Sequence, residues 1–487
     1  MKKLYLTALG YLYLPMLLFI LGWTAVWVQI PVMAVSILAL YWTYKKLTID
    51  EKEELLFSRA GVIAIVVVFF LFCIFCGQGD LFWQDFDWKK HHAILYDLVN
   101  YDWPVVYRDD VMLTYYLGQY IVPGFVGKLL GNSKTVAVWM VAVWNTLGLT
   151  LVYLLICQYL QVNSTWKKAG IFFIMIFWSG ATNLGSEIYQ MIGNEATLCS
   201  YKWIDLNRII VHFASNLDAM RGAFQHVIVP WLGSILFLKH KKNYSIYVLL
   251  ALPMMFSATF GFLYFVLFLL GYFIWNLMIE KRPKEMFVEA FSKENLCILP
   301  LAVVILIYLA GNVLGEKPYG LGWDLLNMFT RLDFFLIFIA VEFLGYMLFL
   351  WKDNRKNVIF YLILAELMLI PFISLGMFND LCSRGSIPAR FLLMVLCIEQ
   401  FYKYGWKNWR NFGIAVIFLI GTMNGFQESY DTVQYSLEQG LGSDELLMDG
   451  IDSYDGWAAD PKKRADDAYN YYTMNYSESL FYKIARK

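Results

Sequence analysis

Charged residues are scarce in this sequence: Asp, Glu, Lys and Arg make up only 16% of its 487 residues, while 59% are hydrophobic. A soluble chain of this length carries about a quarter of its residues as charges, because its surface must stay hydrated. The low charge content therefore excludes an ordinary soluble globular protein. Lys and Arg together number 39, as do Asp and Glu, so the overall charge indicates no nucleic-acid partner.

Cysteine is also rare, with 7 residues at scattered positions. Cys73 and Cys76 form a C-x-x-C pattern at the end of an apolar run, where simple packing is the expected role. Cys199 and Cys382 fall in segments that we expect on the same side of the membrane, so a disulfide between them is only weakly indicated. The cysteines thus give no strong sign of a redox centre.

Long apolar runs, in contrast, recur along the whole chain. Helices are expected to form them, because the runs are continuous rather than alternating and a helix crosses the bilayer with about 20 apolar residues. The 18 Trp and 33 Tyr agree with this, since amphipathic rings collect at membrane boundaries. The predicted fold class is an all-α polytopic protein of the plasma membrane with about thirteen transmembrane helices, at 4–22, 25–44, 60–77, 135–157, 169–183, 224–238, 244–260, 262–279, 296–314, 332–350, 358–376, 389–403 and 411–426.

Six short basic loops share one face of this arrangement. By the positive-inside rule that face is cytoplasmic, and the longer polar segments lie outside the cytoplasm. The basic loops are Lys45–Lys46, Lys167–Lys168, Lys239–Lys242, Lys281–Lys284, Lys352–Lys356 and Lys403–Arg410. The outer segments are 78–134, 184–223, 315–331, 377–388 and the tail from 427.

The chain is expected to have three parts. Residues 1–59 form a transmembrane hairpin with a cytoplasmic loop, and residues 60–426 form the transmembrane core, which includes the outer loop 78–134. The stretch 113–130 of that loop is amphipathic and is expected to lie in the membrane interface. Residues 427–487 form a small extracytoplasmic tail, which either packs as a cap or stays partly disordered.

The densest polar group lies in the first outer loop. Two carboxylates, two lysines and two histidines occur within eight residues: Asp85, Asp87, Lys89, Lys90, His91 and His92. The pattern from Asp87 onward predicts a helix, whose dipole lowers the pKa of a carboxylate at its N-terminus and keeps it ionised. Such a carboxylate could abstract a proton from a hydroxyl or hold a divalent cation. Alternatively, Asp85 is only an N-cap and the other residues solvate an interfacial helix.

The run Asp85-Phe86-Asp87 followed by Lys90-His91 resembles the first-outer-loop signature of the GT-C superfamily of membrane glycosyltransferases, in a branch of bacterial type. These enzymes transfer a sugar from a polyprenyl-phosphate carrier to an acceptor outside the cytoplasm. The continuation 102–107 and the pair 115–116 resemble the family's passage into a second interfacial helix, so the resemblance covers about residues 78–130. The loop follows the third span here rather than the first, which an extra N-terminal hairpin would explain.

The resemblance implies a role for each acidic residue. In the family the first Asp of the signature is the catalytic base, which implies that role for Asp85. Asp87 would assist it, or hold a metal where one is used. No cofactor is required by this scheme, and a divalent cation at the two residues stays open.

Two later segments supply further candidates. Arg221, Gln225 and His226 lie where segment 184–223 re-enters the membrane. They are expected either to contact the carrier phosphate or the sugar, or to be a snorkelling Arg and a capped His. Glu187 and Glu195, in the same segment, are plausible supporting carboxylates.

The segment after 376 holds Asp380, Arg384 and Arg390. An arginine beside hydrocarbon suits a lipid-linked phosphate, which it binds through two parallel hydrogen bonds. The alternative is a structural ion pair between Asp380 and Arg384. The sequence does not decide which arginine binds phosphate. Glu342 and Glu366 lie within predicted spans and are expected to face the protein interior.

The predicted function is an inverting glycosyltransferase whose active site faces away from the cytoplasm. Its partners would be a polyprenyl-phosphate-linked sugar donor, a glycan, lipid or protein acceptor, and membrane lipids. A lipid-linked oligosaccharide polymerase or ligase is one rival, in which arginines and a histidine carry the chemistry. A non-enzymatic flippase or transporter is another, but it should place its charges along a cavity at mid-membrane depth.

Overall fold

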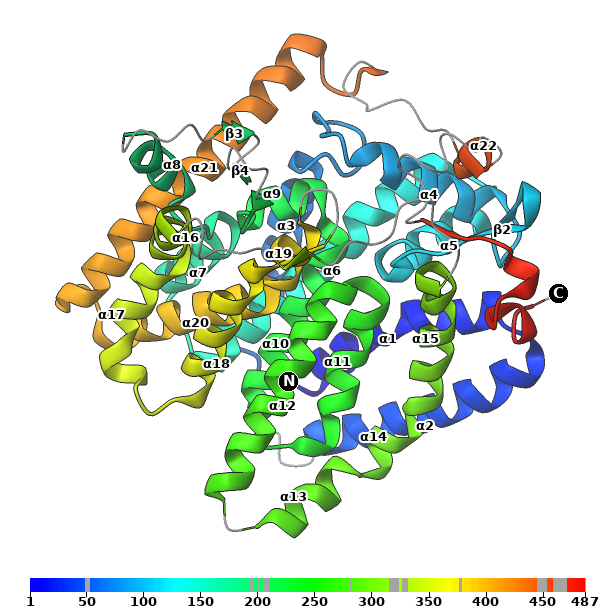
Figure 1. Cartoon of the computed structure of the whole chain (residues 1–487), viewed down its shortest axis with the longest axis horizontal. Coiled ribbons are helices and arrows are strands. Elements are labelled where there is room, and N and C mark those ends of the chain that lie inside the picture. Colours follow the sequence, from blue (N-terminus) through cyan, green and yellow to red (C-terminus); the bar gives the residue numbers. More distant parts are fainter. Residues whose placement is uncertain are drawn as a thin grey trace.

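The chain folds as an all-α, membrane-embedded protein (Figure 1). The computed structural model describes residues 1–48, 53–191, 197–199, 202–204, 210–280, 282–314, 324–325, 332–375, 379–444, 453–458 and 471–486. Within them, six helical segments are long and apolar enough to cross a membrane, and two bent pairs raise this number to eight. The six are α1 (Lys2–Trp23), α2 (Val26–Thr48), α6 (Lys134–Tyr159), α12 (Thr259–Ile279), the run Leu332–Asn354 and the run Asp380–Tyr404.

The remaining apolar helices are bent or short. The bent pairs join α7 (Thr165–Phe177) to α8 (Thr182–Met191), and α13 (Pro283–Ala290) with α14 (Lys293–Cys297) to α15 (Leu299–Leu314). The short helices are α3 (Arg59–Phe75), α10 (Ile228–His240), α11 (Tyr247–Ser257) and α18 (Val358–Leu369). At 1.5 Å per residue, a helix of 13 residues such as α10 is about 20 Å long, less than the hydrocarbon thickness of about 30 Å. The count of thirteen spans therefore stays a prediction.

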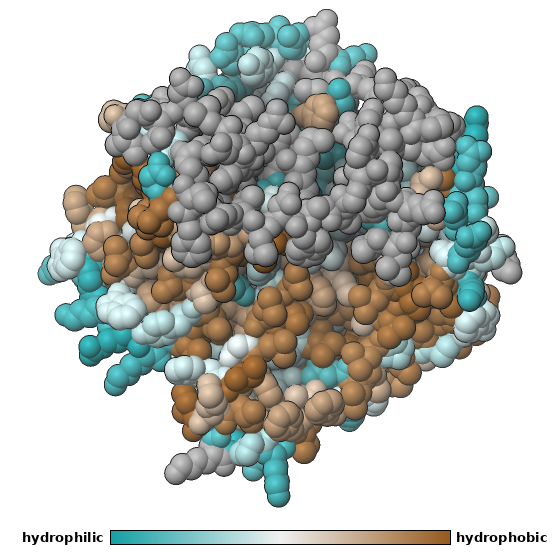
Figure 2. Space-filling view, in the orientation of Figure 1, coloured by the Kyte–Doolittle hydropathy of each residue, from teal (hydrophilic) through white to brown (hydrophobic). Residues whose placement is uncertain are grey.

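Two of the six spanning segments are composite. Leu332–Asn354 contains α16 (Leu332–Ile339), a π-helical turn over Ala340–Leu344 and α17 (Gly345–Asn354). Asp380–Tyr404 contains α19 (Asp380–Gly385) and α20 (Ile387–Tyr404). The longest helix, α21 (Trp409–Gln439), follows and extends well beyond its apolar part. Figure 2 shows apolar residues in a broad band across the described part of one face, with hydrophilic residues gathered at the rim.

The predicted basic loops meet on one side of the molecule. A chain of contacts joins them: Lys46 Nζ to Glu294 Oε2 at 3.3 Å, Lys239 Nζ to Glu53 Oε2 at 3.3 Å, Lys242 Nζ to Glu280 Oε1 at 3.0 Å, Lys168 Nζ to Leu56 O at 2.5 Å, and Tyr402 Oη to Lys167 O. These contacts agree with the expectation that the basic loops share one face of the molecule. The assignment of this side to the cytoplasm stays a prediction.

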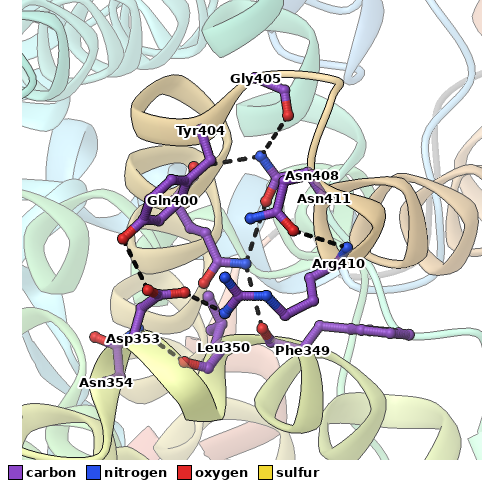
Figure 3. Close-up of polar contacts among 10 residues, drawn as sticks. All are labelled: Phe349, Leu350, Asp353, Asn354, Gln400, Tyr404, Gly405, Asn408, Arg410 and Asn411. Carbon is purple, nitrogen blue, oxygen red and sulfur yellow. Dashed lines mark hydrogen bonds and ion pairs between the residues drawn. The ribbon is translucent and has the colours of Figure 1, made fainter.

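A polar network on the same side fixes the turn between α20 and α21 (Figure 3). Asp353, near the end of α17, accepts hydrogen bonds from Tyr404 Oη at 2.7 Å and from Arg410. Gln400 Nε2 donates to Asn411 Oδ1 at 3.2 Å. These contacts lock three helices together where the chain reverses.

The opposite side carries the first outer loop and the described part of the tail. The loop contains two helices, α4 (Trp88–Asn100) and α5 (Ile121–Leu129), and two short strands, β1 (Val106–Tyr107) and β2 (Val111–Leu113). The tail adds strand β8 (Tyr472–Thr473) antiparallel to β2, with Met112 opposite Thr473. A short helix, α22 (Tyr454–Ala458), packs on the same loop. The described tail residues 453–458 and 471–486 therefore pack as a cap, whereas residues 427–439 continue helix α21.

Two further small antiparallel sheets lie in the later segments. One contains β3 (Thr197–Cys199), β4 (Lys202–Ile204) and β5 (Ile210–Val211), which precede α9 (Asn216–Gly222). The other pairs β6 (Asp324–Leu325) with β7 (Ile373–Ser374). Glu195 lies outside the described residues. Cys73, Cys76 and Cys382 are free and buried, so Cys382 forms no disulfide.

Candidate functional site

Asp85 lies in the turn that starts α4, as the sequence predicted. Its carbonyl oxygen accepts the amide of Trp88 at 3.1 Å, and its Oδ1 accepts the amide of Asp87 at 3.0 Å. Its Oδ2 lies against the last residue of α9, Gly222, where a Cβ atom would be only 2.5 Å away. The carboxylate is therefore held between two short helices from distant parts of the chain.

The two helices are joined by hydrogen bonds from α4 to the end of α9. Trp88 Nε1 donates to the carbonyl of Arg221 at 2.9 Å. His91 Nε2 lies 3.1 Å from the carbonyl of Gly222 and must donate, so Nδ1 of the neutral ring accepts from Tyr120 Oη at 2.7 Å. Burial lowers the pKa of His91 to about 4, which keeps the ring neutral. His91 thus positions the site and has no ring nitrogen left for a substrate.

Burial and the negative charges of Asp87 and Asp218 together raise the pKa of Asp85 to about 7, against the opposing charge of Arg221. The expectation that the helix dipole keeps this residue ionised is therefore wrong. Desolvation of a carboxylate outweighs a partial charge at the end of a helix. A pKa near neutrality is the value that suits a general base, because the group can both accept and release a proton.

Asp87 behaves in the opposite way. Burial alone would raise its pKa, but the positive charges of Lys90 and Arg384 outweigh burial and hold the pKa below its usual value. Lys90 Nζ lies 2.5 Å from Asp87 Oδ1, one turn along α4. Asp87 is therefore an ionised partner for cations, and the two carboxylates have different chemistry.

Arg384 is the second cation at this place, and it comes from α19. Its Nη2 lies 3.3 Å from Asp380 Oδ1, so the structural ion pair considered from the sequence is present. Its charge also acts on Asp87 and on Tyr116, which connects α19 electrostatically to the first outer loop. The ion pair and a phosphate-binding role are therefore compatible, since one guanidinium has five N–H donors.

His226 lies in the same cluster and is fully buried. Its ring is 5.0 Å from the ring of Tyr116, edge to face, and the charges of Arg384 and Lys90 act on it. Within the described part of the chain, neither of its ring nitrogens has a hydrogen-bond partner. A buried imidazole without a partner is costly, which makes it available to a ligand group. We call Asp87, Lys90, Tyr116, His226 and Arg384 the cationic cluster.

Arg390 does not belong to the cationic cluster. It is buried in α20, six residues after Arg384, over the ring of Phe213 at 5.8 Å. The charges that act on it are those of Glu342, in the π-helical turn, and Asp218. Of the two arginines that the sequence left open, only Arg384 lies with the first outer loop.

The other predicted residues are placed at the edge of the site. Lys89 Nζ lies 5.1 Å from the ring centre of Phe86, whose side chain is exposed, so it points away from the carboxylates. His92 Nε2 is 2.9 Å from Gln84 Oε1, a structural contact that holds the turn. Gln225 is buried beside His226, and its Oε1 has no partner among the described residues. Glu187 is exposed.

Three residues of the site were not anticipated. Asp218 lies in the first turn of α9, where the Oγ of the N-cap residue Ser215 accepts its amide at 2.9 Å. Ser215 Oγ also donates to the buried Glu428 of α21 at 3.2 Å, and the carbonyl of Glu428 accepts from Arg221 at 3.4 Å. Tyr471 reaches the cationic cluster from the tail, where Lys90 acts on it. The spacing Ser-x-x-Asp at 215–218 is typical of a helix N-terminus, and could have pointed to Asp218.

The divalent cation considered at Asp85 and Asp87 stays a prediction. Lys90 and Arg221 already supply positive charge beside the two carboxylates. Across the described ranges, no three His, Cys, Asp or Glu side chains gather in a way that could hold a metal. Activity with and without a chelator would test it.

The site thus combines a carboxylate whose pKa is raised to about 7, the two cations Lys90 and Arg384, and an imidazole that has no partner among the described residues. The chain matches no known protein-family model, and no curated protein or solved structure is significantly similar to it.

Proposed function

We propose that this protein is a membrane glycosyltransferase of the GT-C type, which transfers a sugar from a polyprenyl-phosphate carrier to an acceptor on the side opposite the basic loops. The observation that carries the proposal is the pairing of Asp85, whose pKa is raised by burial and by neighbouring carboxylates to about 7, with the cationic cluster beside the start of α4. One group accepts a proton at neutral pH and the other binds an anion.

The proposed reaction is a single displacement. Asp85 takes the proton of an acceptor hydroxyl, and the oxygen attacks the anomeric carbon of the donor sugar. The bond between that carbon and the phosphate oxygen breaks with inversion, and polyprenyl phosphate leaves with the bonding electron pair. Arg384 and Lys90 stabilise the negative charge of the leaving phosphate, which needs no proton.

His226 has a supporting role in this scheme. Its ring contacts that of Tyr116 and lies in the field of Arg384, and its nitrogens, which have no partner among the described residues, can bind a sugar hydroxyl or a phosphate oxygen. The positive-inside rule assigns the basic loops to the cytoplasm, so the proposed site faces the extracytoplasmic side of the plasma membrane.

The test uses the purified protein in liposomes with a panel of synthetic polyprenyl-phosphate hexoses and pentoses. Release of polyprenyl phosphate and a new glycosidic product would be measured together. Asp85→Asn should lower the rate by about 100-fold or more. Asp109→Asn is the matched control, because Asp109 is exposed on the same outer loop and should keep full activity. Equal rates for both variants would contradict the role of Asp85.

The polymerase or ligase reading is favoured by one observation, the buried imidazole of His226 beside Arg384. It predicts that His226→Ala and Arg384→Ala abolish joining of lipid-linked oligosaccharides while Asp85→Asn is tolerated. The transporter reading predicts movement of a solute across the liposome membrane with no covalent product. Each result would replace the proposed reaction.

A further inference from the structure

A cleft of about 910 Å³ lies on the same side of the molecule, away from the proposed reaction centre. Its walls come from the end of α1, the segment after α4, helix α5 and the C-terminal segment, which meet near the C-terminus in Figure 1. The lining residues that matter here are Leu18, Leu21, Trp103, Lys128, Leu129 and Arg486.

The floor of the cleft is part of the membrane-facing surface. Leu18 and Leu21 belong to α1, one of the candidate membrane spans. Leu21 is 46% exposed and Leu129 is 66% exposed, although both are large and apolar. Because α1 ends at Trp23, Leu18 and Leu21 lie in the last two turns of this span, where hydrocarbon is expected to give way to headgroups. An apolar ligand can therefore enter from the bilayer.

The rim of the cleft is positively charged. Lys128 Nζ donates to the carbonyl of Tyr101 at 2.7 Å and weakly to that of Val99 at 3.4 Å, which leaves an N–H for a ligand. Arg486 is anchored by its amide, which donates to the carbonyl of Trp23 at 3.0 Å, and its side chain is exposed. Asp102 also lines the cleft, so two cations minus one carboxylate leave an excess of one positive charge.

The cleft is separate from Asp85. Asp87 precedes α4 and Asp102 follows it, and the 13 residues of this helix span about 20 Å. A molecule of ordinary headgroup size in the cleft would not touch the cationic cluster.

We propose that this cleft binds a glycerophospholipid with an anionic headgroup, taken from the adjacent leaflet. Its acyl chains lie along Leu18, Leu21 and Leu129, and its phosphate lies between Lys128 and Arg486. A free anion would gain nothing from the apolar floor, and a purely apolar ligand would leave the two cations unused. The lipid would join α1, the first outer loop and the C-terminal segment. This proposal does not depend on the proposed glycosyltransferase activity.

Native mass spectrometry of the delipidated full chain, titrated with phosphatidylglycerol, tests the proposal. Arg486→Glu should weaken binding by about tenfold, because a charge that attracts the phosphate is reversed. Leu129→Trp should weaken it as well by filling the floor. Both residues are exposed, so neither variant is expected to affect folding. Lys483→Glu is the matched control, since Lys483 is an exposed cation three residues earlier that does not line the cleft.

The affinities of the variants for phosphatidylglycerol decide whether the cleft is the lipid site. Selective weakening in Arg486→Glu and Leu129→Trp, with normal binding in Lys483→Glu, supports the cleft. Equal affinity in all four proteins, or an equal loss in the control, would show that the lipid binds elsewhere or by surface charge alone. Displacement of the lipid by millimolar inorganic phosphate would show that the rim binds phosphate without the chains, and would also overturn the proposal.

Discussion

The Oδ2 atom of Asp85 lies against Gly222, so closely that a Cβ atom at residue 222 would come within 2.5 Å of it. Only a glycine leaves room for the carboxylate at this place. The clashing atom would be the end of a flexible side chain rather than backbone, so a small substitution would displace the carboxylate without disturbing the helix. Gly222 thus fixes the position of the proposed base.

Gly222→Ala should therefore reduce sugar transfer much more than it reduces stability. A displacement of about 1 Å at a reacting group can lower a rate by about 100-fold. The rate would be measured as release of polyprenyl phosphate, and folding by thermal unfolding in detergent. Gly456→Ala is the control, because nothing lies within 4 Å of a Cβ at that residue. Full activity of Gly222→Ala would mean that Asp85 does not need its observed position.

The dependence of the rate on pH follows from the charges around Asp85. The carboxylate must be ionised to accept a proton, so the rate should rise with pH up to about 7 and then level off. Arg221→Gln removes a charge that lowers the pKa of Asp85, and should shift the profile to higher pH. Asp218→Asn removes a charge that raises it, and should shift the profile to lower pH. Shifts in the same direction would contradict the assignment.

Much of the fold could be predicted from hydropathy and loop charge, which are local properties. The predicted span 135–157 corresponds to α6. The loops around Lys46, Lys168 and Lys239 meet on one side, as expected for loops separated by an even number of spans. The number of spans could not be predicted, because hydropathy does not reveal where a helix ends. α10 and α11 are mostly apolar but too short to cross alone.

The site was predicted in part for a similar reason. Asp85, Asp87 and Lys90 are neighbours in sequence, and their spacing was enough to predict that they lie together at the start of one helix. Glu428 and Tyr471 join them only through tertiary packing, and no local pattern distinguishes them from other polar residues. The pKa of Asp85 was predicted to be lowered rather than raised, because its contact with Gly222 of α9 is also a result of tertiary packing.

The two arginines should respond differently to substitution. Arg384→Gln removes a cation of the cluster, and should lower kcat/KM by about 100-fold while the protein stays folded. Arg390→Gln removes a buried cation on which the charge of the buried Glu342 acts, and should lower the free energy of unfolding by about 3 kcal/mol. Thermal unfolding and donor kinetics would separate the two effects.

The matching rescue is the double variant Arg390→Gln with Glu342→Gln, which removes both charges and should recover part of the lost stability. A folded but inactive Arg390→Gln protein, together with an active Arg384→Gln protein, would reverse the assignment of the phosphate-binding arginine.

Asp97 joins α4 to the tail, and its ionisation should make the stability of the protein depend on pH. The carboxylate accepts hydrogen bonds from Tyr107 Oη at 2.6 Å, Ser453 Oγ at 2.5 Å and the amide of Tyr454 at 3.0 Å. Burial raises its pKa from 3.8 to about 6, so between these values the folded state binds more protons than the unfolded state. The free energy of unfolding should therefore fall by about 3 kcal/mol as pH rises from about 4 to about 6, and this part of the slope should vanish in Asp97→Asn. Denaturant unfolding at pH 4 and 7 measures the difference, with Asp109→Asn as the control that keeps the wild-type slope. The same slope in wild type and Asp97→Asn would mean that Asp97 stays ionised in the folded protein, despite its burial against the tail.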